Sequence, residues 1–144
     1  MSYQVQFEHN IPVPMRDGVV LAADVHRPAS GGEIIEGALP VLLQRTPYNK
    51  ASEARIEEAT FFAANGYVTV MQDCRGRFES EGGFSKYVDD ARDGYDTVEW
   101  LAHAGHRTSR PLPSGPFHPV TPGSYLPRSP YGVKCQIVTA ENVL

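Results

Sequence analysis

A carboxylate, a thiol and a guanidinium follow one another directly after a predicted strand. Asp73-Cys74-Arg75-Gly76 comes after Tyr67–Gln72, a short apolar run typical of a buried strand. Proteins of the α/β class place functional groups at the carboxyl ends of their strands, so Asp73 and Arg75 are candidates for catalysis. The alternative is that these two side chains pair with each other or with neighbouring loops, with Gly76 permitting a tight turn. We favour this structural interpretation.

Histidine and cysteine, the other side chains that often do chemistry, are few and scattered. His9, His26 and His103 fall in predicted strands or helices with no carboxylate or cysteine at motif spacing, which predicts ordinary titrating histidines. The two cysteines are far apart and lack the spacing of a metal site or a redox pair. We expect Cys74 to be a small buried residue, Cys135 to be incidental, and no metal or cofactor to be bound.

The N-terminal segment predicts a β-hairpin. In Tyr3–Asn10 apolar and polar residues alternate, as in a half-buried strand. Asp17-Gly18 is a strong hairpin signal, because glycine adopts a positive φ without strain. Val19–His26 is the expected partner strand, which should end before Pro28.

A strand, a loop and a helix follow the hairpin. Leu39–Gln44 is near-continuously apolar, as in a parallel strand covered on both faces, and Arg45–Lys50 is the loop after it. Ser52 can cap a helix over Glu53–Asn65, and Gly66 can end it. The inward face of this helix should consist of Ile56, Ala59, Phe62 and Ala63.

A second helix is predicted after the strand Tyr67–Gln72 and the loop Asp73–Ser85. Acidic residues open this helix, and Gly105 ends it. The acidic residues are Asp89, Asp90 and Asp93, and the apolar stripe at helical spacing is Ala91, Tyr95, Val98, Leu101 and Ala102. The order of hairpin, strand, helix, strand and helix predicts an α/β fold with a largely parallel sheet.

The pattern changes after Gly105. Seven prolines lie between His106 and Gly132, a density at which neither a helix nor a central strand forms. We expect residues 1–105 to be the folded domain and residues 106–144 to be a disordered Pro/Ser-rich tail, in which only Val133–Val138 is strand-like. Pro-x-x-Pro spacings in the tail leave open an alternative function, a small non-catalytic interaction module with a proline-rich partner-binding tail.

Charge is unevenly spread along the chain. Residues 1–105 carry 16 acids and 9 Lys/Arg, whereas residues 106–144 carry one acid and four Lys/Arg. Nucleic-acid binding rests on Lys/Arg at the phosphates, so we expect no nucleic-acid partner for so acidic a body. No apolar stretch approaches the length of about 18 residues that a membrane span needs. The N-terminus also lacks a signal-peptide pattern, so we expect a cytoplasmic protein.

Four stretches carry a resemblance to one family. They are Ile11–Gly18 with Leu21–Val25 and Pro28, Arg45–Lys50, Gln72–Gly76 with Ser80–Gly82, and Asp93–Leu101. In this order and spacing they resemble the N-terminal part of the catalytic domain in cocaine-esterase-like and X-Pro dipeptidyl-peptidase-like (S15-type) serine hydrolases. Each stretch alone is a weak signal, but four in register are specific. The resemblance implies a partial α/β-hydrolase sheet and, as substrate, a small acyl ester or peptide.

The resemblance also assigns a role to Tyr48. In this family a tyrosine in the matching Pro-Tyr position donates a hydrogen bond to the oxyanion. The loop after the third strand is where α/β-hydrolases supply one oxyanion donor. A fixed donor there stabilises the tetrahedral species by about 3 kcal/mol. Without the resemblance, Tyr48 is an ordinary loop aromatic.

The rest of the catalytic machinery has no counterpart in the sequence. A serine hydrolase of this fold needs a nucleophile at a strand-to-helix elbow, normally Gly-x-Ser-x-Gly. No such motif occurs, and the nearest approaches are Pro113-Ser114-Gly115 and Gly123-Ser124-Tyr125. We expect an inactive N-terminal fragment, because a nearby base is what activates the serine. Completion by a second chain that brings the missing residues is a third interpretation, supported only by the gap it would fill.

The missing nucleophile strand has a structural consequence. In the order that the resemblance implies, it would lie beside Val41–Gln44. We therefore expect this apolar strand to present an unpaired edge and the chain to self-associate through it.

Overall fold

The computed structural model describes residues 2–36, 39–85, 88–104 and 136–139. Within this part of the chain, six strands form one mixed sheet in the order β1-β2-β5-β4-β6, with β3 paired to β2 beside this path. The strands are β1 (Gln4–Pro14), β2 (Val20–Ser30), β3 (Glu33–Ile34), β4 (Val41–Thr46), β5 (Val68–Asp73) and β6 (Gln136–Thr139). The two helices are α1 (Glu53–Ala64) and α2 (Asp90–Ala104). The predicted α/β class is confirmed.

The N-terminal hairpin is longer than expected. β1 and β2 pair antiparallel through the turn at Asp17-Gly18, where Gly18 has φ +85°. β1 continues beyond Asn10, because a register shift between Glu8 and Ile11 lets the pairing resume. β2 runs through Pro28 rather than ending before it. β5 pairs with β2 only as far as His26, so the missing N–H of Pro28 lies beyond that ladder.

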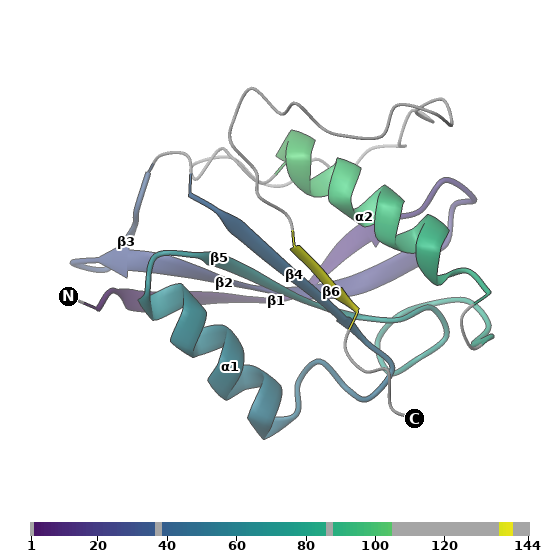
Figure 1. Cartoon of the computed structure of the whole chain (residues 1–144), viewed down its shortest axis with the longest axis horizontal. Coiled ribbons are helices and arrows are strands. Elements are labelled where there is room, and N and C mark those ends of the chain that lie inside the picture. The colour runs from purple at the N-terminus through teal and green to yellow at the C-terminus, as the bar shows by residue number, and fades with distance from the viewer. Residues whose placement is uncertain (1, 37–38, 86–87, 105–135, 140–144) are drawn as a thin grey trace.

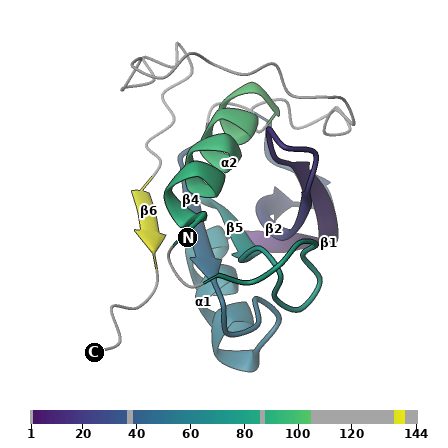
Figure 2. The ribbon, with the colours of Figure 1, turned by 90° about the vertical axis from the view of Figure 1, so that its right-hand side faces the viewer.

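The two central parallel strands lie within two residues of their predicted positions. β4 and β5 pair in parallel from Val41↔Val68 to Thr46↔Asp73, so both strands end at the same edge of the sheet. β4 lies between β5 and β6, and α1 and α2 cover opposite faces of the sheet (Figure 1; Figure 2). The main hydrophobic core lies on the side of α2, where Trp100 and Leu101 join Val25, Leu43 and Val70.

The expected open edge at Val41–Gln44 is not found over most of its length. β6 pairs in parallel with β4 from Leu42↔Gln136 to Arg45↔Thr139. This short strand overlaps the one stretch of the C-terminal segment that was expected to be strand-like. The proline-rich residues before it, with the disorder and partner-binding predicted for them, lie outside the described residues.

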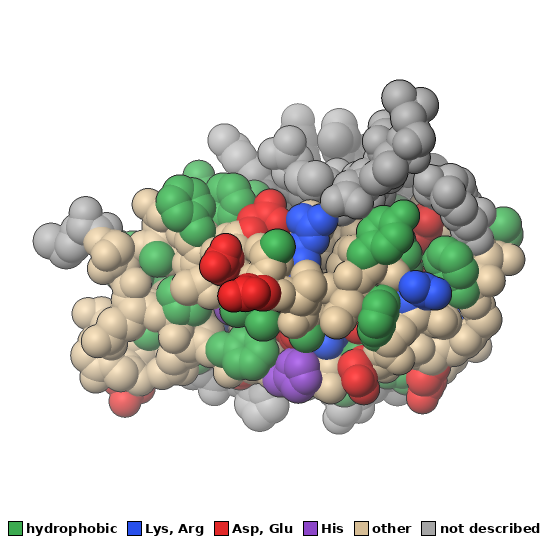
Figure 3. Space-filling view, turned by 90° about the horizontal axis from the view of Figure 1, so that it is seen from below, with side chains coloured by type: hydrophobic (Ala, Val, Ile, Leu, Met, Phe, Trp, Pro, Cys, Tyr) green, Lys and Arg blue, Asp and Glu red, His purple; other side chains and the backbone are tan. Residues whose placement is uncertain are grey.

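Helix α1 packs through small residues. Ala59 and Ala63 are fully buried, but Ile56, expected on the inward face, is 41% exposed. Ser52 occupies the N-cap position, but its side-chain oxygen accepts no capping hydrogen bond, whereas Gly66 ends the helix with φ +95° as predicted. On the face of the molecule in Figure 3, hydrophobic side chains form separate groups with charged side chains between them.

The predicted inward face of α2 was right for Val98 and Leu101, which join the main core, but it missed a polar part of that face. Ala91 is exposed, and Asp93, Asp96 and Thr97 are buried together with Trp100. The helix therefore packs through a partly polar face, whose carboxylates bind arginines from other segments.

No helix among the described residues is long and apolar enough to cross a membrane.

Candidate active site

The loop that carries Tyr48 lies at the carboxyl edge of the parallel strands. β4 ends at Thr46 opposite Asp73, the last residue of β5, and Pro47 and Tyr48 follow directly. The Tyr48 side chain is 53% exposed. None of the hydrogen bonds found among the described residues involves its hydroxyl. The phenol therefore faces solvent at the edge of the sheet where α/β proteins bind their ligands.

Hydrogen bonds of ordinary length hold this loop on both sides of Tyr48. The Tyr48 N–H donates to Thr46 Oγ1 at 3.0 Å, and Arg77 Nε donates to the Pro47 carbonyl at 3.0 Å. After Tyr48 the chain turns at Asn49, which has φ +71° and accepts a hydrogen bond from the Ala51 N–H through its Oδ1. Asparagine tolerates this left-handed conformation better than most residues. The loop is thus held by hydrogen bonds to its backbone and side chains rather than by packing of the Tyr48 ring.

A charge network joins the loop to three strands, and its lysine and two carboxylates are buried whereas its asparagine is exposed. It consists of Asn10, Asp24, Lys50 and Asp73, here called the Lys50 network. Lys50 Nζ lies 2.7 Å from Asn10 Oδ1, 3.0 Å from Asp24 Oδ1 and 3.6 Å from Asp73 Oδ2. The Lys50 N–H also donates to Asp73 Oδ1 at 2.8 Å. Lys50 is only 1% exposed, and burial raises the pKa of the Asp73 carboxyl against the hydrogen bonds that it accepts.

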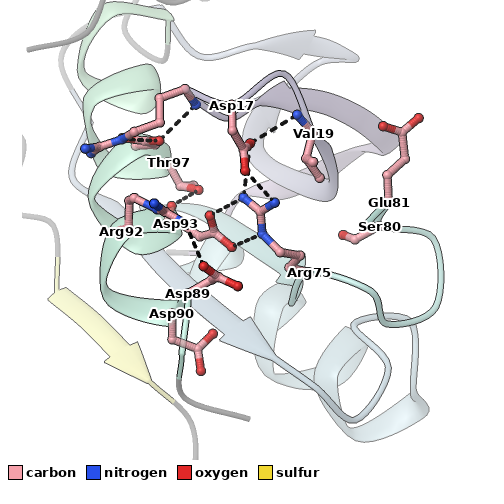
Figure 4. Close-up of polar contacts among 12 residues, drawn as sticks. Asp17, Val19, Arg75, Ser80, Glu81, Asp89, Asp90, Arg92, Asp93 and Thr97 are labelled. Atoms are coloured by element: carbon pink, nitrogen blue, oxygen red, sulfur yellow. Dashed lines mark hydrogen bonds and ion pairs between the residues drawn. The ribbon is translucent and has the colours of Figure 1, made fainter. Parts of the chain in front are cut away.

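Arg75 links three of the four motif stretches (Figure 4). Its guanidinium binds Asp93 of α2 through Nε–Oδ2 at 2.8 Å and Nη2–Oδ1 at 2.7 Å. It also binds Asp17 of the hairpin turn at 2.8 and 3.2 Å. The hydrogen bond from Arg75 lowers the pKa of Asp17, and the hydrogen bond to Asp93 raises the pKa of Arg75. Asp73 and Arg75 therefore pair with neighbouring segments, as the structural interpretation predicted, and not with each other.

Two further arginines join α2 to the rest of the fold. Arg16 Nη2 lies 2.6 Å from Asp96 Oδ1. The buried Arg45, at the end of β4, donates from Nε to Gln72 Oε1 at 2.7 Å and from Nη1 to the Asp90 carbonyl at 2.9 Å. Every motif stretch thus contributes to the polar contacts that surround the carboxyl edge of β4 and β5.

The Ser80-Glu81-Gly82 stretch completes these contacts. Ser80 Oγ donates to the Asp73 carbonyl at 2.7 Å and accepts from the Ala22 N–H at 2.9 Å. Gly76 has φ +70°, and a Cβ there would collide with the backbone of Phe84. The loop after β5 is therefore folded back against the sheet and against itself.

Of the cysteine and histidine predictions, the burial of Cys74 is confirmed, whereas Cys135 and the side chain of His103 lie outside the described residues. Cys74 is buried, and burial raises the pKa of its thiol to about 11. His26 is also buried, and its pKa is lowered by desolvation. His9 has a carboxylate neighbour that its sequence context did not reveal, Asp24 Oδ1 at 3.0 Å. The described residues hold no cluster of three or more His, Cys, Asp or Glu placed to bind a metal ion.

The Lys50 network was not predicted. Lys50 closes the Arg45–Lys50 stretch and looks like a solvated loop lysine, and its partners come from three distant strands. The only signal available in the sequence was that Lys50, Asp24 and Asp73 all belong to the stretches that carry the family resemblance.

The mixed sheet with helices on both faces belongs to the class of the α/β hydrolases, and solved structures agree. An α-amino acid ester hydrolase is 27% identical, with a TM-score of 0.54, over 72% of this chain and 20% of that chain. A CocE/NonD family hydrolase from Staphylococcus aureus is 25% identical, with a TM-score of 0.59, over 70% of this chain and 21% of that chain.

The sequence comparisons give the family. The pattern of the X-Pro dipeptidyl-peptidase (S15) family matches residues 17–124, and the chain belongs to this family. The cocaine esterase of Rhodococcus sp. (strain MB1 Bresler) is 45% identical over 96 residues, which are 64% of this chain and 16% of that esterase. The chain therefore spans about a sixth of the length of this curated relative.

Proposed function

We propose that the chain forms the oxyanion-binding side of the active site of a serine hydrolase that cleaves ester or X-Pro-type amide bonds in small acyl substrates. The observation that carries this proposal is the exposed phenol of Tyr48 on a loop held on both sides of it. The likeness to ester hydrolases over most of this chain supports the reaction class.

The chemistry follows from the charge that acyl transfer creates. Attack on an ester or amide carbonyl places negative charge on its oxygen, and a donor already in position stabilises that charge without reorganising. The Tyr48 hydroxyl is such a donor, because its backbone is fixed and its O–H has no acceptor among the described residues. One donor of this kind contributes about 3 kcal/mol to the transition state, or about a hundredfold in rate.

The nucleophile does not come from these 144 residues in the proposed scheme. They contain no Gly-x-Ser-x-Gly, so turnover needs a serine, a histidine and an acid from residues outside them. The chain by itself should then not hydrolyse activated esters faster than its Tyr48→Phe variant. Burst formation of an acyl-enzyme by the chain alone would contradict this part of the proposal.

A chimera tests the role of Tyr48 directly. The segment of the Rhodococcus cocaine esterase that matches this chain is replaced by the matching residues of this chain, at 45% identity. We expect Tyr48→Phe in the chimera to lower kcat for an activated ester about a hundredfold, with little change in KM, since the bond forms mainly in the transition state.

A matched control removes a hydroxyl elsewhere. Tyr3, 41% exposed, lies before β1 and far from the loop in sequence, and Tyr3→Phe should leave kcat unchanged. A Tyr48→Phe chimera as active as the Tyr3→Phe chimera would overturn the proposed oxyanion role.

A further inference from the structure

The Lys50 network joins the Tyr48 loop to three strands at once. Through Lys50 the loop reaches β5 at Asp73, β2 at Asp24 and β1 at Asn10. Asp24 Oδ1 also accepts the N–H of Asn10 at 2.9 Å, which holds the irregular part of β1 with φ +52° at Asn10. Lys50, two positions after Tyr48, thus connects the loop to three different strands.

Burial of this network is not a simple gain in stability. Lys50, Asp24 and Asp73 are each at most 1% exposed. Taking such charges out of water costs several kcal/mol per ion, and apolar side chains of similar volume often stabilise a fold equally well. Directed hydrogen bonds supply something that apolar packing does not, namely a fixed position and orientation for the segment that carries them.

The contacts before Tyr48 involve no buried ion pair. The Tyr48 N–H donates to Thr46 Oγ1 at the end of β4, and the half-buried Arg77, from the loop after β5, donates to the Pro47 carbonyl. After Tyr48, the backbone bond from Lys50 N to Asp73 Oδ1 and the Lys50 side chain are the connections to the body of the sheet. Loss of the ammonium would also leave two buried carboxylates without their shared cation.

We propose that Lys50 is a positioning residue for Tyr48, because it orders the loop so that the Tyr48 phenol is held where a substrate oxyanion forms. This inference rests on the proposed function. Lys50 touches no substrate in this scheme and acts only through Tyr48. Removing its ammonium should loosen the Tyr48 ring even where the sheet remains folded.

Fluorine NMR of the full chain tests the inference. Fluorotyrosine is incorporated at the seven tyrosines, and the Tyr48 resonance is identified by its loss in Tyr48→Phe. In Lys50→Met we expect the Tyr48 resonance to move most of the way to its position in urea, while the other tyrosines of the described residues keep their native resonances. The matched control is Val70→Ala, which weakens the core on the α2 side without touching the loop and should leave the Tyr48 resonance in place.

A milder variant covers the case in which Lys50→Met does not fold. Asn10→Gly retains the positive φ at this position and removes only the 2.7 Å acceptor of Lys50 Nζ. It should shift the Tyr48 resonance in the same direction by a smaller amount. A Tyr48 resonance at its wild-type position in every folded variant of the network would overturn the inference.

Kinetics of the chimera separate this inference from the proposed function. Lys50→Met should lower kcat by up to about a hundredfold with little change in KM, since a donor displaced by about 1 Å loses about that much. If Tyr48→Phe leaves kcat unchanged, the proposed function fails, whatever the NMR shows. If Tyr48→Phe lowers kcat and Lys50→Met changes neither kcat nor the Tyr48 resonance, the positioning role fails alone.

Discussion

Arg75 binds Asp93 through two parallel hydrogen bonds, Nε to Oδ2 at 2.8 Å and Nη2 to Oδ1 at 2.7 Å. The Asp93 side chain is 1% exposed and the Arg75 side chain 11%. This is the bidentate geometry in which a planar guanidinium cannot be replaced by another cation. It holds the loop after β5 against α2, and so holds the carboxyl edge of the sheet together.

Removal of this guanidinium should therefore be costly. We expect Arg75→Met to lower the free energy of unfolding by about 3 kcal/mol, because it leaves the buried Asp93 carboxylate with only the more distant Arg45 Nη2, at 3.9 Å. Arg75→Lys should lower the free energy of unfolding by less, since lysine retains the positive charge although it cannot form the two parallel hydrogen bonds. Urea unfolding followed by circular dichroism measures both.

An exposed ion pair between an arginine and an aspartate provides the control. Arg92 lies 2.6 Å from Asp89, and its side chain is 48% exposed. Arg92→Met should cost less than about 1 kcal/mol, as exposed pairs usually do. Equal losses in Arg75→Met and Arg92→Met would show that the Asp93 pair has no special importance.

The pH dependence of stability should contain a contribution from Asp17. The hydrogen bond from Arg75 is the main cause that lowers the pKa of this carboxyl below its ordinary value of about 3.9. A lowered pKa adds stability that is fully present above the ordinary value and is lost as the pH falls through the lowered one. The difference in unfolding free energy between wild type and Asp17→Asn should thus be constant near neutral pH and shrink in acid.

The same experiment in an Arg75→Met background identifies the cause. Because Arg75 is the main source of the shift, Asp17→Asn should there have little pH-dependent effect on stability. An unchanged acid profile in this background would assign the shift to the backbone N–H of Val19 instead.

Cys74 should be a sensitive reporter of local unfolding at the carboxyl end of β5, which it directly follows. Burial raises the pKa of its thiol to about 11, so the reactive thiolate is scarce near pH 8. In a Cys135→Ser background, we expect a disulfide reagent to leave Cys74 unmodified in the native chain and to modify it fully in urea. Rapid modification of the native chain would show that the carboxyl edge opens readily.

The strands could be predicted from sequence better than the packing of the helices. β4 and β5 were found within two residues of the prediction, because a short apolar run between loops is a local signal. The apolar part of the α2 face, Val98 and Leu101, was found, but its polar part was missed, because Asp93 and Asp96 are buried against arginines from other segments. Asp96 and Arg16 are 80 residues apart, so the apolar period of the helix could not reveal their pairing.

The candidate site shows the same limit. Tyr48 was singled out through the family resemblance and not through any property of its loop. Lys50 could not be predicted to be buried, because its two carboxylate partners lie on other strands, and only the folded sheet brings them within reach.

The proposed boundary near residue 105 can be tested by limited proteolysis. The seven prolines between His106 and Gly132 predict that this stretch does not offset its ordering entropy. We expect trypsin to cut first near Arg107, Arg110 or Arg128 and to leave a longer-lived piece that ends near residue 105. A C-terminal stretch as protected as the sheet would refute the division into two segments.

The last prediction concerns the edge that β6 covers. β6 pairs with β4 from Leu42 to Arg45, so it occupies the backbone groups through which we first expected self-association. In a strand, successive residues point their N–H groups to opposite sides, so prolines at both Ile137 and Val138 remove at least one donor to β4. This double variant should expose the apolar Val41–Leu43 edge, and sedimentation should show oligomers that increase with concentration. The control is Asn142→Pro, which lies after β6 and should sediment like the wild type. Identical sedimentation of the double variant and the wild type would show that β6 does not protect this edge.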